Sequence, residues 1–484
     1  MLFNSFQFIF LFLPLIVTAF ALAQKYIGKN TQYLLVVLLA GSLIFYAQHS
    51  LKDLAIMVAS IGVNFLIGQK IYQNKRFLVA GLIFNLGLIS YFKYTFFIAE
   101  NVADLLDTSF TMEKMALPLG ISFFTFQQIA YLVDTYRTGQ PERKFTPYAL
   151  LVSFFPHSIA GPLVQYKEIL PQLRQARIST ENFSVGMTIF IIGLFKKVVI
   201  ADSLAPGANI VFDNAASGII PTTAEAWIGA LCYTFQLYFD FSGYSDMAIG
   251  LARIFNINFP FNFDSPYKAT SIIDFWRRWH ITLSLFLKNY VYIPLGGSRH
   301  GTIKKYRNLL FTMFLCGLWH GAGWTFILWG LLHGLLLVGN HGWNSLQIKL
   351  PRLFTLNIAG WILTMLCVIA GWVLFRSQNI HTALTVYAAM LGQSQTGEIS
   401  LENKSVYIIM LTIALFISIS LPNIKDFMAD RLSQNEGSKG TTTSSSFFKW
   451  SPSVTNAFCV SLMTLSILIC MAANKKMEFL YFNF

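Results

Sequence analysis

Residues 308–348 read NLLFTMFLCGLWHGAGWTFILWGLLHGLLLVGNHGWNSLQI and contain no aspartate, glutamate, lysine or arginine. A helix that crosses the ~30 Å hydrocarbon core of a bilayer needs about 20 such residues, because each residue adds 1.5 Å along the axis. This uncharged run of 41 residues is long enough for two helices. We therefore predict two membrane passes here. Counted from Arg307, His320 would lie on the order of 20 Å from the interface, near the middle of the bilayer.

Uncharged stretches of this kind recur along the chain. They run over 1–24, 30–51, 54–69, 77–92, 115–133, 145–166, 353–375, 405–424 and 450–474. Two shorter apolar runs, 183–195 and 226–239, are predicted as spans whose ends carry Lys196, Lys197 and Asp240. From this map we predict ten to twelve membrane spans in total.

The composition supports an all-α polytopic membrane protein. Charged residues make up 12% of the 484 residues and hydrophobic ones 55%, whereas an ordinary soluble domain is roughly 25% charged. This excludes a series of water-soluble domains and a disordered chain. The formal net charge is +13, but the basic residues lie between apolar runs, where they set orientation and meet anionic lipid or phosphate. We therefore predict one integral-membrane domain over residues 1–484 and no nucleic-acid partner.

Three segments outside the clear spans also carry predictions. The first apolar run lacks a basic leader and is predicted to be a retained span, with Lys25 and Lys29 in the cytoplasm and the N-terminus extracytoplasmic. Residues 253–307 hold nine basic residues against two acidic ones, which favours interfacial or re-entrant helices. Residues 437–446 read GSKGTTTSSS and are predicted to be a flexible loop.

The five cysteines form no C-x-x-C pair, so we expect neither a disulfide framework nor a zinc site.

His320 is the clearest candidate for chemistry. An ionisable group near the bilayer centre is costly and by default marks a site or a water-filled path. The structural alternative is a neutral histidine that is satisfied by a hydrogen bond between helices.

His280, which ends the stretch FWRRWH, is the second candidate. If this stretch is helical, Trp276, His280, Ser284 and Lys288 share one face, which offers rings, an imidazole and a cation to a phosphorylated or nucleotide-bearing donor. An interfacial anchor with the same composition is the alternative. His333 lies 13 residues after His320 and would not share its face on a straight helix.

Asp240 opens a polar cluster with Ser242, Tyr244 and Asp246 beside an apolar run. A buried carboxylate needs a partner, and the basic region 253–307 is the nearest supply. We interpret this cluster as a structural network.

Five blocks of sequence carry a resemblance to a known family. They are SFFTFQQ (122–128), FPHSIAGP (155–162), LYFDFSGYSDMA (237–248), FWRRWHITLS (275–284) and GLWHGA (317–322). They resemble the membrane-bound O-acyltransferase (MBOAT) family, and within it the members that O-acetylate alginate. The resemblance covers essentially the whole chain. It implies about eleven tilted transmembrane helices with re-entrant segments around a central tunnel, and a catalytic core at about 115–345.

The resemblance also implies an activity. His320 matches the histidine assigned to catalysis, and His280 matches the second polar position, where it would orient the donor or stabilise an oxyanion. We expect His320 to act as general base while an acetyl group passes from a cytoplasmic thioester, acetyl-CoA or an acyl-carrier protein, to hydroxyls of an alginate-like extracytoplasmic polysaccharide. Arg277, Arg278 and Lys288 are the predicted ligands of the donor phosphates. No metal and no permanently bound cofactor are expected.

The resemblance further implies a bacterial inner-membrane location and extracytoplasmic acetyltransferase partners in a membrane complex. Other readings stay open. A peptidoglycan O-acetyltransferase and a teichoic-acid D-alanyl transferase belong to the same family. A transporter of an acyl lipid or glycan, with His320 as a protonatable gate, belongs to another class, and so does a purely structural scaffold of an export complex.

Overall fold

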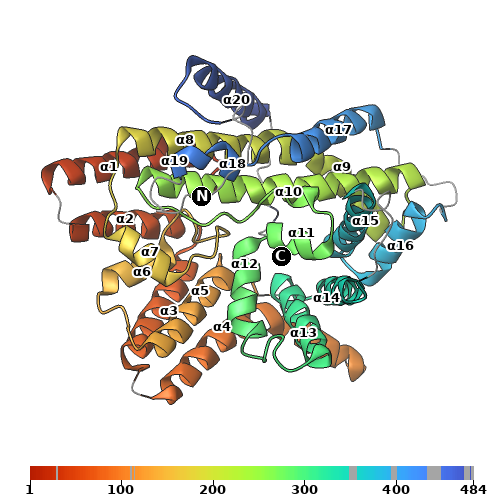
Figure 1. Ribbon diagram of the computed structural model, residues 1–484, viewed down its shortest axis with the longest axis horizontal. Helices are drawn as coiled ribbons and strands as arrows, with labels where there is room; N and C mark the ends of the chain where they lie inside the picture. The colour runs from red at the N-terminus through yellow and green to blue at the C-terminus, as the bar shows by residue number, and fades with distance from the viewer. Residues whose placement is uncertain are drawn as a thin grey trace. The chain divides into compact units, whose positions relative to one another are not determined.

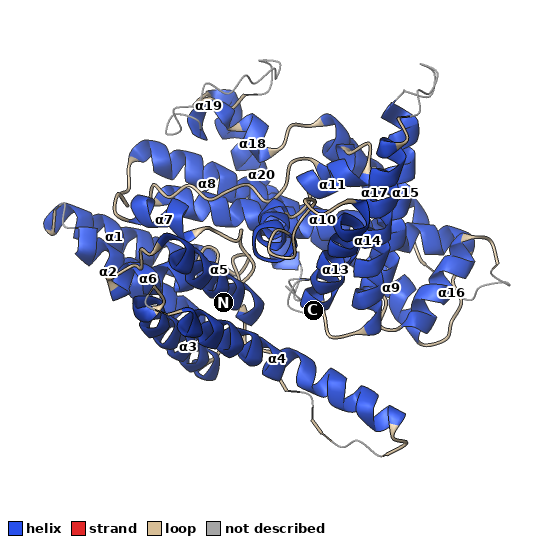
Figure 2. Ribbon diagram, turned by 60° about the horizontal axis from the view of Figure 1, so that its bottom comes forward, coloured by secondary structure: helices blue, strands red, loops and turns tan. Residues whose placement is uncertain are grey.

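The structure of the chain is a computed structural model, and its described residues are all helix, turn or loop (Figure 2). It describes residues 1–28, 31–72, 74–108, 112–113, 115–347, 357–393, 401–432, 449–473 and 480. Lys29 and the predicted loop 437–446 lie outside these residues. The chain forms two compact units, which are described separately below.

Unit 1 comprises the chain from Met1 to Leu194 and the segment Tyr244–Pro260. Its helices are η1 (Phe8–Phe12), α1 (Leu13–Tyr26), α2 (Thr31–Ala47), α3 (Leu51–Lys70), α4 (Lys75–Leu105), α5 (Ile121–Thr138), α6 (Phe145–Ser153), α7 (Tyr166–Leu173) and α8 (Thr180–Phe195). The helices α3, α4 and α5 lie side by side, and α2 packs between α1 and α6 (Figure 1). Phenylalanines fill the space between helices, with the rings of Phe8 and Phe45 tilted against Phe155 and that of Phe12 edge-on to it.

Buried amides join the helices of unit 1. The side chains of Asn64 on α3 and Asn85 on α4 each donate to the other, at 3.2 and 2.6 Å. The amide of Gln128 on α5 donates to the hydroxyl of Ser60 on α3 at 2.9 Å. In an apolar medium no water competes for these groups, so they hold neighbouring helices in register.

Unit 2 comprises Phe195–Gly243 and the chain from Phe261 to Asn474. Its helices are η2 (Lys196–Ala201), α9 (Asp202–Ala216), the first part of α10 (Thr223–Ile254), η3 (Pro266–Lys268), α11 (Ile272–Arg278), α12 (Ile281–Leu287), η4 (Lys288–Tyr292), α13 (Thr302–His320), α14 (Trp324–Ser345), α15 (Asn357–Arg376), α16 (Ile380–Met390), α17 (Lys404–Ser420), α18 (Ile424–Phe427), α19 (Ala429–Leu432) and α20 (Val454–Ala473). The helix α14 packs between α13 and α15, and α11 lies against it (Figure 1).

Six helices among the described residues are long and apolar enough to cross a bilayer. They are Phe8–Tyr26, Leu51–Lys70, Lys75–Leu105, Thr180–Ala216, Ile358–Arg376 and Val454–Ala473. Shorter apolar helices cover Thr31–Ala47, Ile380–Met390 and Lys404–Ser420. The all-α membrane architecture is confirmed, while the count of ten to twelve spans stays a prediction.

The predicted pair of helices in residues 308–348 is present as α13 and α14. Three residues, Gly321 to Gly323, connect them. The first helix begins at Thr302 rather than near Arg307, and it ends at His320. Neither helix is among the six described above as long and apolar enough, so the two membrane passes and the depth of His320 stay predictions. The helices touch at glycines, since a methyl group on Gly330 would lie 3.0 Å from Cα of Gly317 and closer still to a backbone carbonyl of α13.

The helices continue through Lys196, Lys197 and Asp240, the predicted span ends, so where the spans themselves end stays a prediction. The segment Thr180–Ala216 is one continuous helical stretch, and Asp240 lies inside the 32-residue helix α10. The charges are tolerated there because the ammonium of Lys197 lies 2.6 Å from a carboxylate oxygen of Asp240 and 2.6 Å from one of Asp202. The side chains of Lys197 and Asp240 are each only 2% exposed. The structure thus pairs Asp240 with a cation outside the region 253–307.

The glycine contact leads to a stability prediction. We expect Gly330→Ala to lower the unfolding free energy by about 1–3 kcal/mol, because the added methyl group forces α13 and α14 apart. The matched control is Gly339→Ala on the same helix, where nothing lies within 4 Å of the new methyl group. Thermal unfolding of the purified variants in one detergent measures both effects. An equal loss of stability in the two variants would contradict the close contact of α13 and α14 at Gly330.

Candidate active site

His320 lies where helix α13 stops. Its side chain is buried, at 7% exposure, and Gly321 follows in an extended conformation. A side chain at Gly321 would collide with the ring of Phe326, so the helix can end here only because this residue is glycine. The imidazole packs edge-on against Trp319, Trp329 and Phe375, whose ring centroids lie 4.9, 5.1 and 5.1 Å away.

His280 lies at the junction of α11 and α12, and its backbone is in the left-handed region, with φ 44° and ψ 54°. This conformation costs a non-glycine residue on the order of 1 kcal/mol and persists only where the surroundings enforce it. The predicted helical face through Trp276 and His280 is therefore wrong, because α11 ends at Arg278. The imidazole is fully buried. Burial lowers its pKa, so the ring is neutral at pH 7.

The structure brings the two predicted histidines to one aromatic ring. The ring centroid of Trp319 lies 4.9 Å from that of His320 and 6.2 Å from that of His280. Phe241 of α10 packs edge-on against His280 at 4.7 Å. Two imidazoles separated by 40 residues in the sequence thus flank one indole inside unit 2.

The sequence analysis set His333 aside, and the structure places it beside the same cluster. Its ring lies 4.9 Å from that of Trp329, which lies 5.1 Å from His320 on the other side. The indole N–H of Trp276 donates to Nδ1 of His333 at 3.3 Å. A straight helix would separate the two histidines, but the chain reverses between α13 and α14. Trp329 and His333 are one helical turn apart, so they lie on one face of α14. Once the chain is known to reverse at Gly321, this spacing indicates that both can lie near His320.

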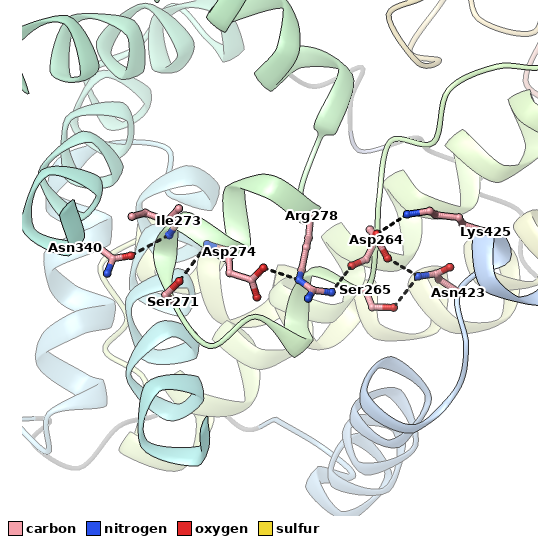
Figure 3. A network of polar contacts seen from close by, with 9 residues as sticks. All are labelled: Asp264, Ser265, Ser271, Ile273, Asp274, Arg278, Asn340, Asn423 and Lys425. Carbon is pink, nitrogen blue, oxygen red and sulfur yellow. Dashed lines mark hydrogen bonds and ion pairs between the residues drawn. The ribbon is translucent and has the colours of Figure 1, made fainter. Parts of the chain in front are cut away.

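The three residues predicted to bind the donor phosphates, Arg277, Arg278 and Lys288, have different surroundings. Arg277 and Lys288 are exposed. The guanidinium of Arg278 donates to Asp274 at 2.9 Å and to the backbone carbonyl of Asp264 at 3.2 Å (Figure 3). Arg278 therefore has a structural role, whereas a part for these cations in donor binding stays a prediction.

The network in Figure 3 ties the basic region 253–307 to two other segments of unit 2. The carboxylate of Asp264 accepts from Lys425 at 2.9 Å and from Asn423 at 2.8 Å. At the N-terminus of α11, Asn340 of α14 accepts from the backbone N–H of Ile273 at 3.1 Å. These contacts hold the segment 264–278, which leads into His280, against other parts of unit 2.

Two further buried polar residues can be placed. His157 is buried in unit 1, where its ring packs against Phe259 at 5.2 Å. Asn262 precedes His280 by 18 residues and contacts its ring. The sequence analysis missed Asn262, although a short polar residue in the aromatic stretch PFNFD (260–264) is the available signal. Among the described residues no group of three histidine, cysteine, aspartate or glutamate side chains lies close enough to hold a metal ion.

Comparison with known proteins agrees with the resemblance seen in the sequence. The model of the MBOAT, membrane-bound O-acyltransferase, family matches residues 144–382. This range contains His280, His320 and His333, together with Asn262.

Several relatives match over most of their length. The chain is 44% identical over 430 residues to the peptidoglycan O-acetyltransferase of Helicobacter pylori, which covers 81% of this chain and 80% of that protein. It is 38% identical over 506 aligned residues to the probable alginate O-acetylase AlgI of Pseudomonas putida, over 100% of both chains. A teichoic acid D-alanyltransferase of Bacillus subtilis is 28% identical over 284 residues, 54% of this chain and 69% of that protein. With full-length identity of this order to an O-acetylase, the chain belongs to the membrane-bound O-acyltransferase family of enzymes.

Proposed function

We propose that the chain moves an acetyl group from a cytoplasmic thioester to hydroxyls of an extracytoplasmic polysaccharide, with His320 as general base. The observation that carries the proposal is the meeting of His320 and His280 at the ring of Trp319. Both imidazoles are buried in an all-helical chain of an acyltransferase family. An ordinary packing histidine needs no second imidazole at the same indole.

The proposed step forms one ester and breaks one thioester. The acceptor hydroxyl loses its proton to the imidazole of His320 while its oxygen bonds to the thioester carbonyl carbon. The carbon–sulfur bond then breaks, and the leaving thiolate takes up a proton. Proton abstraction of this kind contributes about 10²–10⁴-fold, and holding the two substrates in line supplies the larger share.

The donor is proposed to be acetyl-CoA or an acetylated carrier protein. Both carry phosphate, which suits the exposed cations Arg277 and Lys288. Arg278 is a weaker candidate, because its Nε already donates to Asp274 and its Nη1 to the backbone carbonyl of Asp264.

The acceptor is proposed to be a glycan outside the cytoplasmic membrane. An alginate-like polymer is the first candidate. The full-length match to a probable alginate O-acetylase supports it. A peptidoglycan acceptor is the second candidate, because the identity to a peptidoglycan O-acetyltransferase is higher, at 44%. Relatives named for D-alanyl transfer are only 26–28% identical.

Further parts of the proposal rest on the family, on the basic residues after the first span and on the composition of the chain. We propose a multi-pass protein of the bacterial inner membrane with an extracytoplasmic N-terminus, one domain over 1–484 and a catalytic core at about 115–345. Extracytoplasmic acetyltransferases are proposed as partners, since a glycan acceptor lies on that side of the membrane.

The proposed function is tested with purified protein in vesicles. Radiolabelled acetyl-CoA, or acetylated carrier protein, is given on one side and alginate or peptidoglycan on the other. Covalent label on one glycan supports the proposal and identifies the acceptor. Label that crosses the membrane without forming an ester would contradict the proposed acetyl transfer and indicate a transporter.

We expect His320→Ala to lower acetyl transfer by at least about 10²-fold, because the general base is lost. The control is His381→Ala, an exposed histidine on α16, which should transfer at the wild-type rate. Acetyl transfer and gel-filtration profile are measured for each. Full activity in a folded His320→Ala protein would refute the general-base role.

We expect Arg277→Gln and Lys288→Gln to raise the KM for the donor about 5- to 10-fold without changing the KM for the glycan, because each removes one contact to phosphate. Lys52→Gln, an exposed lysine on α3, is the control. Steady-state kinetics with varied donor decide the point. Unchanged donor dependence in both variants would remove these cations from the donor site.

A further inference from the structure

Asn262 clamps the backbone turn that carries His280. Its backbone carbonyl accepts from the N–H of Ile281 at 2.9 Å. Its side-chain oxygen Oδ1 lies 3.3 Å from the backbone nitrogen of Thr282, 2.9 Å from the hydroxyl of Thr282 and 3.0 Å from Nδ1 of His280. Asn262 is itself buried, at 1% exposure. One residue thus binds three consecutive positions, and so holds His280 in its left-handed conformation.

These contacts determine which way the amide of Asn262 points. A backbone N–H can only donate, so the atom that faces the nitrogen of Thr282 must be the amide oxygen and not the NH₂ group. The same oxygen faces Nδ1 of His280. Because the oxygen only accepts, Nδ1 must carry a hydrogen.

The other ring nitrogen of His280 follows from this assignment. A neutral imidazole has one N–H, and here Nδ1 holds it. Nε2 therefore carries a lone pair. Nε2 is buried and has no hydrogen-bond partner within the described part of the chain. A buried acceptor without a partner is costly unless something else binds it.

We propose that Asn262 is a positioning residue that locks His280 in the Nδ1–H form, so that Nε2 accepts a hydrogen bond from an O–H or N–H group of a substrate. The inference deepens the proposed function and rests on it for the identity of the substrate. It also decides between the two roles predicted for His280. A ring whose only N–H is bound to Asn262 cannot donate to an oxyanion, so His280 orients a substrate and a different group stabilises the oxyanion.

The first test observes the resting protein and needs no activity. Full-length protein with ¹⁵N-labelled histidine rings is compared with its His280→Gln variant, which identifies the His280 signals. At pH 7 we expect a protonated Nδ1 and an unprotonated Nε2. A protonated Nε2 on His280 would overturn the inference whether or not the protein transfers acetyl groups.

The second test separates the clamp from general packing. Asn262→Leu removes the acceptor, and we expect Nε2–H to become populated and transfer to fall about 10- to 100-fold. Thr282→Val is the matched control, since it removes the hydroxyl that binds the same oxygen and leaves the His280 contact in place. The Nδ1–H form should persist there. The same tautomer change in both variants, or in neither, would contradict the assignment.

The third test uses the isosteric variant Asn262→Asp. A carboxylate keeps the acceptor at Nδ1 and favours the imidazolium, so it raises the pKa of His280. Since only the unprotonated Nε2 accepts a hydrogen bond, the acid limb of the pH–rate profile of Asn262→Asp should move to higher pH. At high pH, Asn262→Asp should transfer acetyl groups at least about tenfold faster than Asn262→Leu. An unmoved acid limb would refute the role of Asn262. If the wild-type protein transferred no acetyl group from any donor, only the proposed function would be refuted. The Nδ1–H form of His280 is observed in the ¹⁵N-labelled resting protein and does not depend on activity.

Discussion

Lys197 binds two carboxylates at once, and long helices of unit 2 depend on that contact. Its ammonium lies 2.6 Å from oxygens of both Asp202 and Asp240. A charge taken out of water costs several kcal/mol unless partners compensate it inside the protein. Without the lysine, two carboxylates would be stranded in apolar helices. The same constraint applies to every polar group buried in the membrane-embedded part of the chain, because a bilayer supplies no water to satisfy it.

The constraint explains why the imidazoles have fixed surroundings. His333 accepts from the indole N–H of Trp276, and His280 donates to Asn262. The paired amides of Asn64 and Asn85 obey the same rule in unit 1. Each contact favours one orientation of a ring or an amide. A favoured orientation is what an acyltransferase needs, because preorganised groups act without rearranging during the reaction.

The sequence predicted the helical membrane class, the helix pair α13 and α14, and the two histidines that meet at Trp319. These predictions rest on local features: uncharged length for the helices, an ionisable residue within such a run for His320, and the stretch FWRRWH for His280. The helical face through Trp276 and His280 was wrong because no local signal marks the left-handed turn, which the distant Asn262 enforces. His333 was set aside because the reversal at Gly321 had to be known first. Lys197 was placed at a span end because its carboxylate partner on α10 lies 43 residues away.

The hairpin of α13 and α14 is stiff where it carries His320. Its two helices touch at Gly317 and Gly330, and the imidazole is wedged between three aromatic rings at the apex. A side chain held in this way has no freedom to swing from one reactant to the other. In the proposed function, the thioester and the glycan therefore both have to reach the nitrogen of His320, each from its own side of the membrane. We therefore expect the arrival of the reactants and the release of the products, rather than motion of His320, to limit the rate of the proposed reaction.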